Sequence, residues 1–442
     1  MDVNSFVIGY NKGKASAPAG GTVAEKDVNF YDYDGTLLYS YTVEEAQKLT
    51  SLPKLPEQPG LICQEWNWTL DEIKTHNGNA DVGATYVTDD GSTRLYVEMP
   101  DGLTTFKLIL DGYSGTIDWG DGSSVETFAG GRKNLSHTYA HPGEYVISVK
   151  SDNLLLGRNS SSYNLISDLS TSNYALFNTL KKVELGASMG RIDSDTFEQC
   201  NELKSITIPK NTRELSSYAF KKCQKLSSVI LPRGIGTIGS YCFDSCYTMK
   251  TVSIGNGTTS IGNYAFQNCY NLASITLPDS VTSIGTNAFY YTYGFENVSL
   301  SNGLTSIDAN AFANCYGLRS ITIPNSVSSI GNNAFSTCTQ LVNVTIPNSV
   351  TTMGTYAFAG CYGLSKIAMP SGVTTISNYI FRNCKGLKIV DFTSHSEVPV
   401  LSNINSFDGL PTDYEIRVPV SLYDSWKSAT NWSGLAYKIV GV

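Results

Sequence analysis

The sequence is poor in charge and in histidine, and it has no long apolar run. Charged residues make up 16% of the 442-residue chain, which contains 4 histidines. Disordered acidic or basic chains and coiled coils need far more charge, so both classes are excluded. No stretch of about eighteen apolar residues occurs, which excludes a membrane-spanning helix. Glycine and tyrosine are abundant instead, with 39 and 27 residues.

The charge that is present is divided unevenly along the chain. Residues 1–150 hold 21 of the 39 acidic residues but 11 of the 31 basic ones. Within residues 251–365 the charged residues are Asp279, Glu296, Asp308 and Arg319. A surface this neutral releases few counterions from phosphates, so the sequence argues against nucleic acid as a partner.

A repeat of 23 residues organises the second half of the chain. Its clearest column holds nine phenylalanines: Phe197, Phe220, Phe243, Phe266, Phe289, Phe312, Phe335, Phe358 and Phe381. Apolar residues recur six positions after each phenylalanine, and an eroded further copy begins near Tyr174 and Phe177. One coil of this length cannot bury these side chains alone, whereas stacked coils can, so the period predicts a solenoid.

Each coil is expected to contain a short strand, a turn, a second extended piece and a helical turn. Alternating apolar residues such as Ile206 and Ile208 predict the strand. Pro209 ends it, because proline cannot donate a hydrogen bond to a ladder. A Ser, Gly or Asp after the second extended piece, such as Gly239, is a favourable N-cap for the turn that carries the Ala-Phe-x-x-Cys core.

Eight of the ten cysteines stand in one column, three residues after the phenylalanine, where one coil has Thr292 instead. Cys63 and Cys242 lie outside this column. Disulfides and metal sites need thiols that converge in pairs or fours, whereas this column places one thiol in each coil. We interpret these cysteines as small buried apolar side chains.

The repeat resembles the BspA type of bacterial surface leucine-rich repeats. Residues 263–272, Asn-Tyr-Ala-Phe-Gln-Asn-Cys-Tyr-Asn-Leu, are similar to the N-x-A-F-x-x-C-x-x-L core of that family. The resemblance covers roughly residues 165–395. It implies a leucine-rich-repeat solenoid with no catalytic residue in its motif, and a role in adhesion to host proteins, cells or other bacteria.

The first 80 residues follow other patterns. Residues 1–27 divide into an apolar docking segment, residues 1–10, and a flexible linker rich in glycine and alanine. Residues 28–80 predict a small α+β domain, with a hairpin turn at Asp34-Gly35. Capping boxes at Thr42 and Thr69 predict the starts of two short helices.

Residues 81–150 show strand patterns only. Trp119-Gly120-Asp121-Gly122-Ser123 and His137-Thr138-Tyr139 resemble the polycystic-kidney-disease (PKD) type of immunoglobulin-like domain. This resemblance implies a β-sandwich that acts as a spacer, and Trp119 and Tyr139 are expected to fill the space between its sheets. We interpret Asp118 and Asp121 as turn residues, because a calcium loop needs further oxygen ligands.

The predicted fold class is therefore mainly β with short helical turns. A leucine-rich-repeat solenoid of 23-residue coils at residues 151–395 is preceded by the β-sandwich and the small α+β unit. Residues 396–442 leave the repeat register, and Trp426 and Trp432 predict a C-terminal cap, which a solenoid requires.

The sequence shows no arrangement typical of catalysis. His137 and His141 belong to the sandwich pattern, whereas His76 and His395 stand alone. No cluster supplies a nucleophile with a base and an orienting group, and no glycine-rich phosphate loop joins a strand to a helix. We expect no enzymatic activity, no cofactor and no metal.

The candidate ligand-binding residues are tyrosines in two outward columns. One column follows the cysteine position and holds Tyr247, Tyr270, Tyr293, Tyr316 and Tyr362; the other lies two residues before the phenylalanine and holds Tyr218, Tyr241, Tyr264, Tyr356 and Tyr379. Rigid amphipathic rings bind partners at low entropic cost, and neutral sugars can place their C–H faces on them. In the alternative interpretation these tyrosines only cover the apolar turn.

A second candidate surface is the strand face, which offers hydroxyl and amide groups. It carries Ser205, Ser228, Thr251, Ser274, Ser320 and Asn343. These groups suit contact with a protein or a glycan.

The expected function is adhesion or recognition, through the solenoid, of a protein or neutral glycan on a host or bacterial surface. One alternative is a structural or host-attachment protein of a phage or prophage particle, docked to a larger assembly through residues 1–10. It arises because the first residues show neither the basic region nor the apolar region of a secretory signal. The expected location is accordingly the bacterial cell surface or a particle surface. A scaffold without its own ligand is the third alternative.

Overall fold

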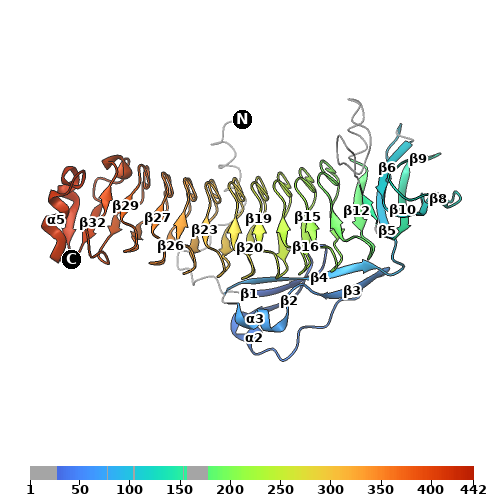
Figure 1. Cartoon of the computed structure of the whole chain (residues 1–442), viewed down its shortest axis with the longest axis horizontal. Helices are drawn as coiled ribbons and strands as arrows, with labels where there is room; N and C mark the ends of the chain where they lie inside the picture. The colour runs from blue at the N-terminus through green and yellow to red at the C-terminus, as the bar shows by residue number, and fades with distance from the viewer. Residues whose placement is uncertain (1–26, 77, 103–104, 153, 157–177) are drawn as a thin grey trace.

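The computed structural model describes residues 27–76, 78–102, 105–152, 154–156 and 178–442. The expected docking segment and linker, and Tyr174 and Phe177, lie outside the described residues. Figure 1 shows a long row of stacked coils with a sandwich at the N-terminal end and a helical cap at the C-terminal end. The small α+β unit lies along one side of the row.

Two sets of short parallel strands run along the solenoid. The first contains β12 (Leu180–Glu184), β14 (Ser205–Thr207), β16 (Ser228–Leu231), β18 (Thr251–Ile254), β20 (Ser274–Thr276), β22 (Asn297–Ser299), β24 (Ser320–Thr322), β26 (Asn343–Thr345), β28 (Lys366–Ala368) and β30 (Ile389–Asp391). The second contains β13 (Arg191–Ile192), β15 (Glu214–Leu215), β17 (Thr237–Ile238), β19 (Ser260–Ile261), β21 (Ser283–Ile284), β23 (Ser306–Ile307), β25 (Ser329–Ile330), β27 (Thr352–Met353), β29 (Thr375–Ile376) and β31 (Val400–Leu401). Equivalent residues of successive coils pair, as Ser260 does with Ser283. This pairing confirms the solenoid.

The nine phenylalanines form one internal stack, and each is 0% exposed. From Phe197 to Phe358, neighbouring ring centroids lie 5.2–5.5 Å apart with nearly parallel planes. The backbone N–H of Phe312 donates to the carbonyl of Ala334 in the next coil, at 2.9 Å, and the other coils repeat this bond. The phenylalanine column therefore joins the coils through both its rings and its peptide groups.

The cysteine column supplies a second bond between coils. The thiol of Cys315 donates to the carbonyl of Phe289 in the preceding coil at 3.3 Å. Thr292 makes the equivalent bond from its hydroxyl to Phe266, at 3.1 Å. The position therefore requires a small donor rather than sulfur chemistry, which explains why threonine is accepted. All ten cysteines are free, and burial raises the pKa of the Cys338 thiol to about 12.

The expected helical turn of each coil is a run of tight turns rather than a continuous helix. The N–H of Leu318 donates to Cys315, three residues earlier, at 3.2 Å. Two residues per coil have left-handed backbones, such as Asn310 with φ 55° and Asn314 with φ 60°. The left-handed conformation stops helical growth, so each turn closes after a few residues.

The α+β unit is built on a four-stranded sheet in the order β2-β1-β4-β3. Its elements are β1 (Asp27–Tyr31), β2 (Leu37–Thr42), α2 (Val43–Gln47), β3 (Leu61–Trp66), α3 (Leu70–Thr75) and β4 (Ala80–Thr88). Both helices begin with the predicted capping boxes, at Thr42 and Thr69. Because β4 pairs with β1 and β3, this sheet extends beyond residue 80 to Thr88.

The sandwich contains β5 (Thr93–Met99), β6 (Thr105–Asp111), β7 (Gly115–Asp118), β8 (Glu126–Phe128), β9 (Lys133–Thr138), β10 (Gly143–Ser151) and β11 (Leu155–Leu156). Trp119 and Tyr139 are buried as predicted, and the Tyr139 hydroxyl donates to the Trp119 carbonyl at 2.9 Å. Asp118 and Asp121 accept hydrogen bonds from turn amides.

The sandwich differs from the expected spacer in how it joins the solenoid. Strand β5 pairs with β12, so the first coil continues a sandwich sheet. One hydrophobic core runs from Leu95 in the sandwich, through the coils, to Ile439 near the C-terminus. The sandwich therefore closes the N-terminal end of the solenoid instead of standing apart from it.

The C-terminal cap comprises η1 (Ile404–Phe407), β32 (Glu415–Val418), η2 (Val420–Leu422), α5 (Tyr423–Ser428), η3 (Trp432–Lys438) and β33 (Ile439–Gly441). Trp426 and Trp432 are fully buried with ring centroids 4.6 Å apart, and both contact Phe392. They cover the end of the core, as predicted. In the described parts of the chain, no helix has the length and apolarity needed to cross a bilayer.

One buried carboxylate of the α+β unit makes its stability depend on pH. Asp81 in β4 is 7% exposed, and burial raises its pKa to about 6 despite hydrogen bonds with Asn29 and Tyr31. The folded state therefore favours the protonated form. The resulting stabilisation is complete below the unfolded pKa of about 3.9 and is lost as pH rises through about 6.

We predict that Phe312→Ala lowers the free energy of unfolding by about 3–5 kcal/mol, because it opens a cavity between two stacked rings. Urea unfolding measures the change. The control Val342→Ala, at a side chain that is 45% exposed, should stay within about 0.5 kcal/mol of the parent. An unchanged melting temperature for Phe312→Ala would contradict the internal stack.

We also predict that Asp81→Asn stabilises the protein by up to about 2–3 kcal/mol at pH 7.5 and has little effect at pH 4, because each unit of pKa shift corresponds to about 1.4 kcal/mol. Urea unfolding of both proteins at the two pH values tests this. Asp34→Asn, at an exposed hairpin position, is the control. Equal pH slopes for the parent and Asp81→Asn would show that the carboxylate is not responsible.

Candidate recognition surfaces

The predicted tyrosine columns form stacks on the turn edge of the solenoid. Ring centroids from Tyr247 through Tyr270 and Tyr293 to Tyr316 lie 5.0, 4.9 and 4.8 Å apart. In the other column, Tyr218, Tyr241 and Tyr264 stack at 5.0 and 4.5 Å, and Tyr356 and Tyr379 stack at 4.7 Å. Tyr362, the remaining candidate, is 46% exposed.

The stacking changes what these tyrosines can offer to a ligand. Interplanar angles within the stacks are 5–10°, so the ring faces inside a stack contact each other. A sugar cannot cover a face that a neighbouring ring already covers. Stacked members offer ring edges and hydroxyl groups instead, which corrects the expectation of C–H contacts along the whole column.

The column two residues before the phenylalanine has a further role in the backbone. Tyr218, Tyr241, Tyr264, Tyr356 and Tyr379 all have φ between 57° and 63°. A left-handed backbone is uncommon for a bulky residue and persists only when the surrounding structure imposes it. These five tyrosines therefore serve the turn itself as well as its surface.

Cations lie over the rings near both ends of the tyrosine edge. The Lys221 ammonium lies 4.9 Å from the Tyr218 centroid and 5.3 Å from the Tyr241 centroid. Arg382 lies over Tyr379, and Lys385 lies over Tyr362. The coils between these ends carry few charged residues, because the charged residues of 251–365 are only Asp279, Glu296, Asp308 and Arg319.

Burial keeps the middle tyrosines protonated. It raises the pKa of Tyr270, Tyr293 and Tyr316, with neighbouring tyrosines adding to the effect. The hydroxyls of Tyr270 and Tyr316 donate to the side chains of Asn268 and Asn314, at 3.5 and 3.3 Å. The middle of the edge is thus a row of neutral hydroxyl groups held by the turn.

The strand face, the second candidate surface, is partly occupied by the chain itself. The α+β unit lies against β14 to β20, beneath the first coils in Figure 1. Ser228 is buried there, and Ser205, Thr251 and Ser274 are partly buried. Ser320 and Asn343 remain exposed. Within the described residues, the C-terminal part of this face is therefore the more exposed part.

Two side chains of the α+β unit form buried hydrogen bonds directly with the solenoid strands. Asn67, fully buried, donates to the Leu231 carbonyl and the Ser253 hydroxyl, both at 2.9 Å. The indole N–H of Trp68 donates to the Ile254 carbonyl at 2.8 Å. These bonds fix the position of the unit along the coils.

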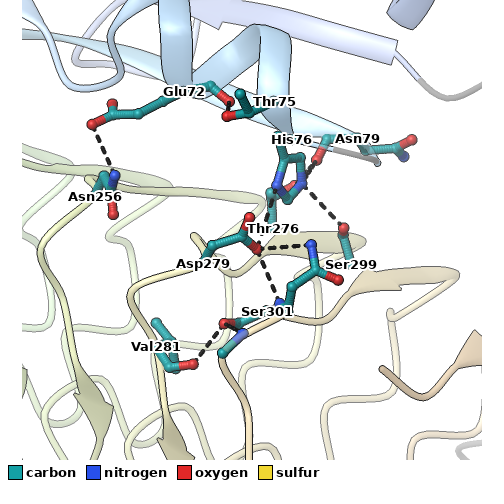
Figure 2. Close-up of polar contacts among 12 residues, drawn as sticks. Glu72, Thr75, His76, Asn79, Asn256, Thr276, Asp279, Val281, Ser299 and Ser301 are labelled. Atoms are coloured by element: carbon teal, nitrogen blue, oxygen red, sulfur yellow. Dashed lines mark hydrogen bonds and ion pairs between the residues drawn. The ribbon is translucent and has the colours of Figure 1, made fainter. Parts of the chain in front are cut away.

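Close packing and charge pairs complete this interface. A Cβ added to Gly83 would overlap the Ile230 side chain, so only glycine lets the two sheets approach this closely. At the rim, Glu72 accepts from Arg233 at 2.7 Å and from Asn256 at 2.8 Å. Figure 2 shows this contact with Asn256, and shows His76 between Asp279 and Ser299.

Sequence reasoning missed this interface, although two signals were present. Ile230 stands in a strand column that otherwise holds residues such as Thr207, Ser253 and Thr276. Arg233 follows in the same coil and faces the acidic N-terminal unit. The described residues contain no group of three or more His, Cys, Asp or Glu side chains placed to hold a metal.

Comparisons with known proteins agree with the repeat architecture. The family model described as "BspA type Leucine rich repeat region" matches residues 168–296 and 282–403, with six copies. No curated protein matches the chain.

Among solved structures, a leucine-rich repeat protein from Bacteroides ovatus is 25% identical with a TM-score of 0.46; the match covers 54% of this chain and 66% of that protein. A leucine rich cell surface protein from Faecalibacterium prausnitzii is 25% identical, with 61% and 79% covered and a TM-score of 0.37. The T. pallidum leucine rich repeat protein is 28% identical, with 45% and 83% covered and a TM-score of 0.36. Because the family model spans more than half of its length, the chain belongs to the BspA-type leucine-rich repeat family.

Proposed function

We propose that this protein is a non-enzymatic adhesion or recognition protein whose tyrosine edge binds a protein or neutral glycan on another surface. The observation that carries the proposal is the unbroken stack from Tyr247 to Tyr316, which places neutral hydroxyl groups at regular intervals. Such an array suits a repetitive partner with hydrogen-bonding groups. Long-range charge contributes little, because these coils carry few charges.

The geometry favours the middle of the tyrosine edge over its ends. Cations already cover Tyr218, Tyr362 and Tyr379 near the ends. In the middle of the edge, the turn holds the hydroxyls of Tyr270 and Tyr316 through Asn268 and Asn314. Preorganised rings and hydroxyls lose little entropy when a ligand binds.

A bacterial cell surface is the proposed location. The repeats resemble the BspA type, which is typical of bacterial surface proteins. The similar protein from Faecalibacterium prausnitzii is described as a cell surface protein. A phage or prophage role would depend on residues 1–10, which lie outside the described residues. The assignment of the sandwich to the PKD-like domains, and the division into five segments, are likewise proposals.

The test is a triple substitution, Tyr270→Ser, Tyr293→Ser and Tyr316→Ser, assayed on glycan arrays and on panels of immobilised surface proteins. We expect at least a tenfold loss of affinity for the partner found with the parent, with the fold retained by circular dichroism. The matched triple change to phenylalanine keeps the stack and removes only the hydroxyls. It should also weaken binding if hydroxyl groups make the contact.

Binding at this edge should change little between pH 6 and pH 8, because the raised pKa values keep these hydroxyls protonated. Full affinity in the serine triple would move the site elsewhere on the protein. The absence of any saturable ligand for the parent would favour the scaffold alternative instead.

A further inference from the structure

A polar crevice opens where the α+β unit meets the solenoid. It has a volume of about 660 Å³, within the range typical of small-ligand sites. It is lined by Glu65 at the end of β3 and by three successive coil turns, contributing Lys210, Asn211, Arg213, Arg233, Gly234, Asn256 and Gly257. Apart from the two glycines, every lining residue has a polar or charged side chain.

The crevice brings together three cations from the first coils of the solenoid, which carry most of its positive charge. Lys210, Arg213 and Arg233 come from two adjacent coils, whereas the single cation of residues 251–365 is Arg319. The acidic groups are Glu65, with its carboxylate 3.8 Å from the Lys210 ammonium, and Glu72, bonded to Arg233. Three cations thus face two carboxylates, which leaves one net positive charge.

Both arginines keep donors that no described residue uses. Arg213 donates through Nη1 to the carbonyls of Lys210 and Thr212, at 2.7 and 3.4 Å. Arg233 uses Nη2 for Glu72, while its Nε is buried without a hydrogen-bond partner among the described residues. An unpaired buried donor is costly to the folded state.

The backbone makes room for one of these guanidinium groups. A Cβ added at Gly234 would overlap Nη1 of Arg213, so the absence of a side chain there lets Arg213 lie across the coil. Gly257 occupies the equivalent position of the next coil. Because the carbonyls of Lys210 and Thr212 hold Arg213, its planar group is preorganised for a planar anion.

We propose that this crevice binds the carboxylate of an acidic glycan, such as a hexuronate residue. Arginine donors match a carboxylate through paired charge-assisted hydrogen bonds. The Asn211 and Asn256 amide nitrogens each use one donor within the protein, on Ala187 and Glu72, and each amide group carries a second N–H that suits a sugar hydroxyl. This site lies apart from the tyrosine edge and adds an acidic ligand to the proposed recognition function.

The test is calorimetric titration of the full chain with tri-galacturonate, with its methyl ester as the matched neutral ligand. We expect saturable binding of the acid that weakens with added salt, and at least tenfold weaker binding of the ester. Arg213→Gln should reduce affinity for the acid at least tenfold. Gly234→Ala, which displaces the same guanidinium, should also reduce it. Arg319→Gln, a cation distant in the chain, should leave it unchanged.

The proposal fails if the parent does not bind the acid, or if acid and ester bind equally. It also fails if a hexaglutamate peptide or inorganic phosphate binds while the uronate does not, because the crevice would then serve a different anion. The serine triple of the tyrosine edge should bind tri-galacturonate normally. Loss at one site with retention at the other separates failure of this inference from failure of the proposed function.

Discussion

A coil of 23 residues cannot bury its own phenylalanine, so each coil depends on the ring and the peptide groups of the next one. The ring of Phe312 lies between those of Phe289 and Phe335, and its N–H donates to Ala334. The small donor of the cysteine column then bonds back to the preceding phenylalanine carbonyl. Because every coil needs two neighbours, the ends need substitutes, and the sandwich and the tryptophan cap supply them.

The same interval governs the outer surface. Residues at equivalent positions of successive coils lie one strand spacing apart, about 4.8 Å, which is close to the stacking distance of aromatic rings. Tyrosines repeated at the 23-residue period therefore stack whether or not a ligand is present. The consequence for recognition is that their edges and hydroxyls, rather than their faces, are available. The docked α+β unit covers part of the strand face, whereas the tyrosine stacks lie on the turn edge.

Much of this architecture could be predicted from local sequence, because a repeat converts local pattern into long-range order. The columns of Phe312 and Cys315, the capping box at Thr69 and the burial of Trp119 each follow from spacing or from a short motif. The left-handed turns also have a signal in the sequence. The column of Tyr264 also contains Asn287 and Asn310, and asparagine is enriched in that conformation. The docking of the α+β unit could not be predicted, since Asn67 meets Leu231 across more than 160 residues. In the repeat sequence, the docking is indicated only by departures from the column pattern, such as Ile230.

The coils and both end caps form one cooperative stack joined through the phenylalanine column. Hydrogen exchange of the intact protein, resolved to individual amides, tests it most directly. We expect slow exchange at similar rates for the amides of Phe243, Phe266, Phe289, Phe312 and Phe335, because opening one coil exposes its neighbours. If these amides instead exchanged as fast as those of exposed turns, or each at its own unrelated rate, the coils would be independent and the account would be contradicted.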